Sequence, residues 1–138
     1  MEFTLRDVVR YNTVFKNIID QSSIPGQLKF RFLTALKQFE PATDNLTTIR
    51  NELIAKYGSE QPGGGYGILE PVRENFDSDE AFQEAIKHYN EQLQLFDEEM
   101  NKVMDETINI DFNKFDVSIM NSSIPADALL LIYDLIEA

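Results

Sequence analysis

The sequence predicts a mainly α protein, an antiparallel helical hairpin or small bundle with a kinked long helix, plus a short β element near residues 107–119. Apolar residues recur at spacings of three and four over most of the chain, as they do on one face of an α-helix. The tetrapeptide Ser-Ser-Ile-Pro, which is typical of a helix start, occurs at 22–25 and again at 122–125. Residues 59–77, with four Gly and two Pro, interrupt the helical pattern once.

The first expected helix begins at Thr4 and ends near Gln21. Thr4 and Asp7 have the spacing of a capping box, in which each side chain bonds the backbone N–H of the other residue. The apolar residues that share one face of this helix are Leu5, Val8, Val9, Phe15, Ile18 and Ile19.

A second helix is expected from Pro25 to Gly58, a residue that suits a helix C-terminus. Pro41 lies inside it. Because the apolar spacing keeps its phase across Pro41, we favour one long helix kinked there, with two helices that share a face as the alternative. The shared stripe comprises Leu28, Phe32, Leu33, Leu36, Phe39, Leu46, Ile49, Leu53 and Tyr57.

The Gly-rich segment 59–77 is interpreted as a mobile loop or as a small hairpin around Tyr66–Leu69. A third helix is expected to begin at Asp77 or Ser78. Its apolar spacing holds for about three heptads, which suits antiparallel packing in a helical hairpin. The residues concerned are Phe82, Ala85, Ile86, Tyr89, Leu93, Phe96, Met100 and Val103.

Two alternating segments follow the third helix and account for the β element. Residues 107–112 and 115–119 alternate apolar and polar residues, which predicts extended chain with a bulge or turn at 113–114. A last helix is expected after Pro125, and its sequence is too apolar for every side of it to face solvent. With 138 residues, we expect a single domain, 1–138, with a Gly-rich loop at 59–77.

No catalytic, cofactor-binding or metal-binding residues are assigned. The chain has no Cys, which excludes disulfides, thiolate nucleophiles and cysteine metal sites. Its one histidine, His88, lies on the regular third helix, outside any serine-hydrolase motif. The glycines at 63–67 lack the Gly-Lys-Ser/Thr of a phosphate-binding loop. We therefore expect a protein without enzymatic activity and without a cofactor.

The net charge of −12 is unevenly distributed along the chain. Residues 1–57 carry eight bases and six acids, a net of +2, whereas residues 70–111 carry thirteen acids and three bases, a net of −10. Such acidity argues against direct binding to nucleic acid and against docking on an anionic membrane. A candidate acidic face for binding a partner comprises Glu91, Asp97, Glu98, Glu99, Asp105 and Glu106.

Several segments, in this order, resemble small tailed-bacteriophage proteins of unknown function. They are TLRDVV at 4–9, PGQLKFRFLTALK at 25–37, RNELIAKYG at 50–58, the acidic helix, TINIDF at 107–112 and IPADALLLIYDLIE at 124–137. The resemblance implies a phage origin and no known catalytic residues. Because the N-terminus also lacks the pattern of a signal peptide, we expect the protein in the host cytoplasm or in the virion.

Two functions follow as hypotheses. The first is a structural or assembly component of a phage, acting through protein–protein contacts with phage proteins or as a homo-oligomer. The second is an acidic inhibitor or decoy, a mimic of nucleic acid, that binds a host nuclease or defence effector through the acidic face. Salt distinguishes them, since binding through charge weakens as ionic strength rises.

Overall fold

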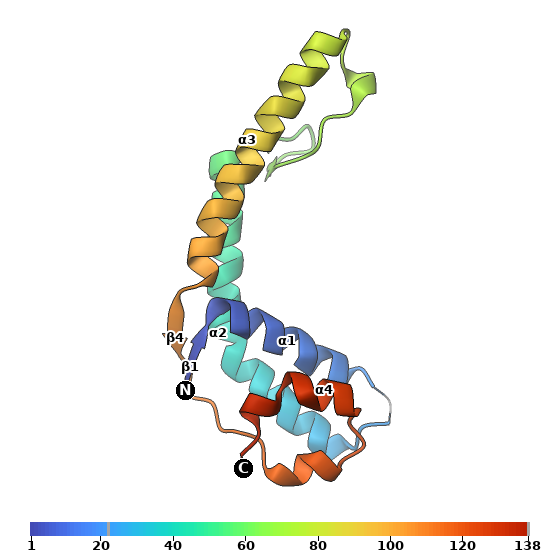
Figure 1. The fold of residues 1–138 in the computed structure, drawn as a ribbon, viewed down its shortest axis with the longest axis vertical. Helices are drawn as coiled ribbons and strands as arrows, with labels where there is room; N and C mark the ends of the chain where they lie inside the picture. Colours follow the sequence, from blue (N-terminus) through green and yellow to red (C-terminus); the bar gives the residue numbers. More distant parts are fainter. Residues whose placement is uncertain (22, 138) are drawn as a thin grey trace. The chain divides into compact units, whose positions relative to one another are not determined.

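The computed structural model describes all residues from 1 to 138 except Ser22 and Ala138, and most of the described chain is helical (Figure 1). The chain divides into two compact units. Unit 1 comprises Met1–Asn45 and Asp105–Ala138, and unit 2 comprises Leu46–Met104. Helix α2, Gly26–Tyr57, contributes to both units, so the long helix predicted across Pro41 is confirmed as one element.

Unit 1 has a core of aromatic side chains. Phe15, Phe32 and Phe39 are fully buried, and the ring centroids of Phe15 and Phe39 lie 5.5 Å apart. Phe112 and Phe115, from the segment after α3, complete the cluster. The elements that surround this core are β1 (Glu2–Thr4), α1 (Leu5–Ile19), the first part of α2, β4 (Thr107–Asn109), η2 (Val117–Asn121), α4 (Ala126–Leu131) and η3 (Tyr133–Leu135).

Strand β1 forms a two-stranded antiparallel sheet with β4, with Phe3 opposite Ile108. The predicted β element is therefore present at 107–109, and its partner is an N-terminal strand of three residues that the sequence pattern did not indicate. Three residues are too few for an alternating pattern to be distinguished from the start of a helix. The pairing places the first turn of α1 beside residues 105 and 106.

The second predicted extended segment, 115–119, is wrong for most of its length. Only Phe115 pairs, in an isolated parallel bridge with Ile136, and Val117–Asn121 is the 3-10 helix η2. The carboxylate of Asp116 accepts a hydrogen bond from the Ser118 backbone N–H at 2.8 Å, which stabilises the start of the helical turn. The alternation of apolar and polar residues over 115–119 therefore did not produce a strand, because the Asp116 side chain caps a helical turn there.

The last predicted helix is shorter than expected. Helix α4 ends at Leu131 and the chain continues as the 3-10 helix η3. Ile132, the residue that ends α4, and Leu135 of η3 are both fully buried. Figure 1 shows α4 in red beside α1 in dark blue.

Unit 2 comprises the end of α2, strands β2 (Ser59–Glu60) and β3 (Tyr66–Gly67), the 3-10 helix η1 (Arg73–Asn75) and helix α3 (Asp79–Met104). Of the two interpretations of 59–77, a hairpin is present, because β2 pairs with β3 in antiparallel fashion, but it turns at residues 61–65, before the predicted position at Tyr66–Leu69. Gly64 and Gly65 make its turn at φ values of +90° and +75°, which glycine adopts without strain.

Helix α3 begins as predicted, because the Ser78 hydroxyl accepts the backbone N–H of Ala81 and caps the helix. None of its 26 residues is buried. The eight residues of its predicted apolar stripe are all half-buried instead. No helix in the described part of the chain is both long enough and apolar enough to cross a membrane.

Candidate functional site

The six residues of the candidate acidic face lie in both units. Glu91, Asp97, Glu98 and Glu99 are on α3 in unit 2, whereas Asp105 and Glu106 precede β4 in unit 1. The first three are exposed and Glu99 is half-buried. The structure therefore brings four of the six onto one helix.

On α3 these four acids do not share one side. Glu91 and Glu98 are seven residues apart, which places both on the side opposite the apolar stripe. Asp97 and Glu99 immediately flank Glu98, so each points about 100° away from it, in opposite directions. Glu84, which was not among the candidates, lies on the same side as Glu91 and is exposed. The acidic ridge of α3, as we call it below, is Glu84, Glu91 and Glu98.

Glu99 is used inside unit 2. Its carboxylate accepts a hydrogen bond from the Tyr57 hydroxyl at 2.6 Å and an ion-pair hydrogen bond from the Lys56 ammonium at 3.0 Å. The Tyr57 hydrogen bond, followed by the Lys56 hydrogen bond, lowers the pKa of Glu99, and the bond to Glu99 raises the pKa of Lys56. Glu99 therefore connects α3 to the end of α2.

This contact predicts an acid-dependent loss of stability in unit 2. Because the pKa of Glu99 is lower in the folded than in the unfolded chain, its contribution is complete above the usual value of 4.5 and is lost as pH falls through the folded pKa. We expect Glu99→Gln to destabilise the protein near neutral pH and to be indistinguishable from the parent in acid, in thermal unfolding as a function of pH. An equal difference at every pH would contradict the contact, and Glu98→Gln is the control.

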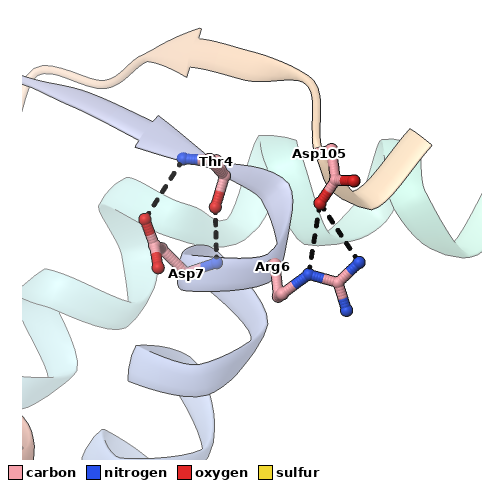
Figure 2. Close-up of polar contacts among 4 residues, drawn as sticks. All are labelled: Thr4, Arg6, Asp7 and Asp105. Carbon is pink, nitrogen blue, oxygen red and sulfur yellow. Dashed lines mark hydrogen bonds and ion pairs between the residues drawn. The ribbon is translucent and has the colours of Figure 1, made fainter. Parts of the chain in front are cut away.

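Asp105 holds the start of α1, as Figure 2 shows. Its carboxylate accepts hydrogen bonds from the Arg6 guanidinium at 3.3 and 3.2 Å, while the Leu5 backbone N–H donates to the Glu106 carbonyl at 3.0 Å. The predicted capping box is confirmed: the Asp7 N–H donates to the Thr4 hydroxyl at 3.1 Å, and the Thr4 N–H donates to the Asp7 carboxylate at 3.4 Å. Asp105 and Glu106 thus have a structural role.

The two folded units differ much less in net charge than the N-terminal and central segments of the sequence do. Unit 1 contains seven bases and twelve acids, a net of −5, and unit 2 contains five bases and twelve acids, a net of −7. The reason is that the basic N-terminal region folds together with the acidic residues after position 104. Both units are acidic, and the contrast seen along the sequence does not create oppositely charged units.

Large exposed apolar side chains form a second candidate surface, in unit 1. Tyr133 and Val117 are 62% and 54% exposed, and with Met120 and Ile136 they line a shallow hollow of about 350 Å³. Leu130, three residues before Tyr133, is 73% exposed. We call Val117, Met120, Leu130, Tyr133 and Ile136 the C-terminal apolar surface.

The sequence did not predict this surface. The apolar run after Pro125 predicted that the last helix is covered on at least one side, and Ile132 and Leu135 of that run are buried, but Leu130 and Tyr133 are exposed. Val117 was missed because the alternating segment 115–119 was interpreted as a strand, and Met120 follows that segment. The stripe predicted for the second helix includes Phe32 and leaves out Phe30, and the structure agrees, because Phe32 is buried and Phe30 is 70% exposed.

The one histidine of the chain, His88, is exposed on α3. Across the described residues, no group of three His, Asp or Glu side chains is arranged to hold a metal ion. The chain matches no family model, and no curated protein or solved structure is similar to it.

Proposed function

We propose that the chain is a non-enzymatic structural or assembly component of a tailed bacteriophage that acts through protein–protein contacts at its C-terminal apolar surface. The observation that carries this proposal is the exposure of Leu130 and Tyr133, at 73% and 62%. Tyr133 lines one hollow with Val117 and Met120, and exposed apolar side chains that gather within a charged rim are typical of protein-binding sites. The rim here comprises Lys114, Asp134 and Glu137.

The phage origin rests on the resemblance of the segments named above, in particular IPADALLLIYDLIE at 124–137. That segment supplies both exposed residues of the proposal. It also supplies Ile132 and Leu135, which are fully buried and hold the segment on the core of unit 1. The surface is therefore supported by a packed element, which keeps its shape constant and reduces the entropy cost of binding.

The acidic decoy is the alternative function, and the acidic ridge of α3 is the observation that favours it. Glu84, Glu91 and Glu98 are all exposed, at a spacing of seven residues. Glu99 and Asp105, by contrast, are already bonded to Lys56 and Arg6. Only part of the expected acidic face is available to a basic partner.

Two double variants separate these functions. Leu130→Asp with Tyr133→Asp adds two negative charges to the apolar surface, whereas Glu91→Gln with Glu98→Gln removes two from the acidic ridge. All four side chains are exposed, so we expect thermal unfolding of both variants to match the parent. The measurement is the amount of the chain in purified phage particles or bound to phage structural proteins, by quantitative mass spectrometry.

The proposal predicts that Leu130→Asp with Tyr133→Asp abolishes incorporation of the chain, and that Glu91→Gln with Glu98→Gln, the ridge variant, retains it. Loss in the ridge variant alone would favour the decoy. Absence of the parent protein from particles and from every complex with phage structural proteins would contradict the structural or assembly role.

A further inference from the structure

The apolar stripe of α3 is incompletely covered by its own unit. Tyr57 and Lys56, at the end of α2, contact Glu99 in the second half of α3. Along the first half, Phe76 lies 5.7 Å from Phe82 between ring centroids, and the Gln92 amide donates to the Ser59 hydroxyl at 3.3 Å. Despite these contacts, no α3 side chain is buried. Two helices and a short hairpin do not enclose the stripe, which requires another packed layer.

The charged residues of α3 are placed so that its apolar stripe can pack against the same stripe of a second copy of the chain. Unit 2 carries a net charge of −7, and like charges placed opposite each other would oppose self-association. The acidic ridge, however, lies on the far side of the helix from the stripe. Neutral amides flank the stripe at Gln83 and Asn90 on one side and at Gln92 on the other, together with the acids Asp79, Asp97 and Glu99. Gln83 and Asn90 are exposed, whereas Gln92 donates to Ser59 of its own unit.

Those flanking amides favour a second copy over a basic partner. Charged residues beside the apolar seam of paired helices determine which partner is accepted. A basic partner would be matched by acids there, but two of the three acids that flank the stripe are already ion-paired within unit 2: Asp79 with Arg73, and Glu99 with Lys56. Amides both donate and accept hydrogen bonds, so they can pair with their own kind across a two-fold axis.

The dimensions of α3 allow a small interface. At a rise of about 1.5 Å per residue α3 is about 39 Å long, and with side chains it is about 10–12 Å wide, so one side of it covers on the order of 400 Å² per copy. A symmetric pair would bury on the order of 800 Å², which is below the usual size of a specific interface, so we expect a weak dimer.

We propose that unit 2 is a dimerisation unit, in which the apolar stripe of α3 packs against the same stripe of a second copy around a two-fold axis. The end of α2 and the whole of α3 from each of the two copies then form a four-helix arrangement, in which the acidic ridge of each α3 faces solvent. This interface is separate from the C-terminal apolar surface. The dimer and the proposed function consequently succeed or fail independently.

Two charge variants of the 138-residue chain test the dimer by sedimentation equilibrium. Gln83→Glu with Asn90→Glu places two new acids beside the stripe, and Lys87→Gln with Lys102→Gln makes the same change of net charge on the outer side of α3. All four residues are exposed, so neither variant should alter thermal unfolding of the monomer. We expect a parent dimer whose dissociation constant rises about tenfold in the flank variant at low salt, through like-charge repulsion, and remains unchanged in the lysine variant.

High salt should restore the affinity of the flank variant. A parent protein that is monomeric at every concentration would overturn the proposal. So would an equal shift in both variants, which would indicate a general charge effect. A dimer that is unaffected by the flank variant but is lost in Leu130→Asp with Tyr133→Asp would place self-association at the C-terminal apolar surface instead.

Discussion

Phe32→Ala is expected to destabilise unit 1 by about 3–5 kcal/mol, the usual cost of removing a buried aromatic side chain. Phe32 is fully buried, and its ring centroid lies 4.7 Å from that of Phe115 and 5.6 Å from that of Phe15. The truncation leaves a cavity between α2 and the segment that follows β4. Urea denaturation followed by circular dichroism measures the loss.

Phe30→Ala is the matched control for this prediction. Phe30 is on the same helix, two residues earlier, but is 70% exposed. We expect its substitution to change the free energy of unfolding by less than about 0.5 kcal/mol. An equal loss of unfolding free energy in Phe32→Ala and Phe30→Ala would mean that α2 does not turn the side that carries Phe32 toward the core of unit 1.

Gly58→Ala is expected to have the second large effect, by disrupting the connection between α2 and β2. A Cβ at this position would collide with the carbonyl oxygen of Ile54 and would lie 2.7 Å from that of Gly67. Both obstacles are backbone atoms, so the hairpin must move away from the helix end. The strain is expected to cost about 1–3 kcal/mol.

Hydrogen exchange localises this effect better than global unfolding. In Gly58→Ala the amides of Gln61 and Gly64, which bond within the hairpin, should exchange faster than in the parent. Gly63→Ala is the control, because a Cβ there meets no atom within 4 Å. Unchanged protection at both amides in Gly58→Ala would contradict the close approach of helix and hairpin.

The helices were predictable because their signals are local. Thr4 and Asp7 specify the start of α1, and the continuous 3–4 spacing predicted one helix across Pro41. The failures involve longer-range packing. Val9 was expected in the core but is 37% exposed, and Tyr11, which was not expected there, is buried against Phe3 and Phe15.

The candidate acidic face was only partly predictable for a related reason. A count of acids cannot reveal that Glu99 bonds Tyr57 or that Asp105 bonds Arg6, 99 residues away. Helical periodicity separated Phe32, on the predicted stripe, from Phe30, which lies outside it. It could not show that Leu33, on the same predicted stripe, is 47% exposed.

We propose that the chain binds its partners through apolar contacts and not through its charge. Extraction with increasing salt, applied to any phage particles or complexes in which the protein is found, separates the two kinds of binding. We predict that the chain stays bound as ionic strength rises, because apolar contacts are not screened by salt. Release of the chain by salt alone would contradict the claim and assign binding to the acidic ridge.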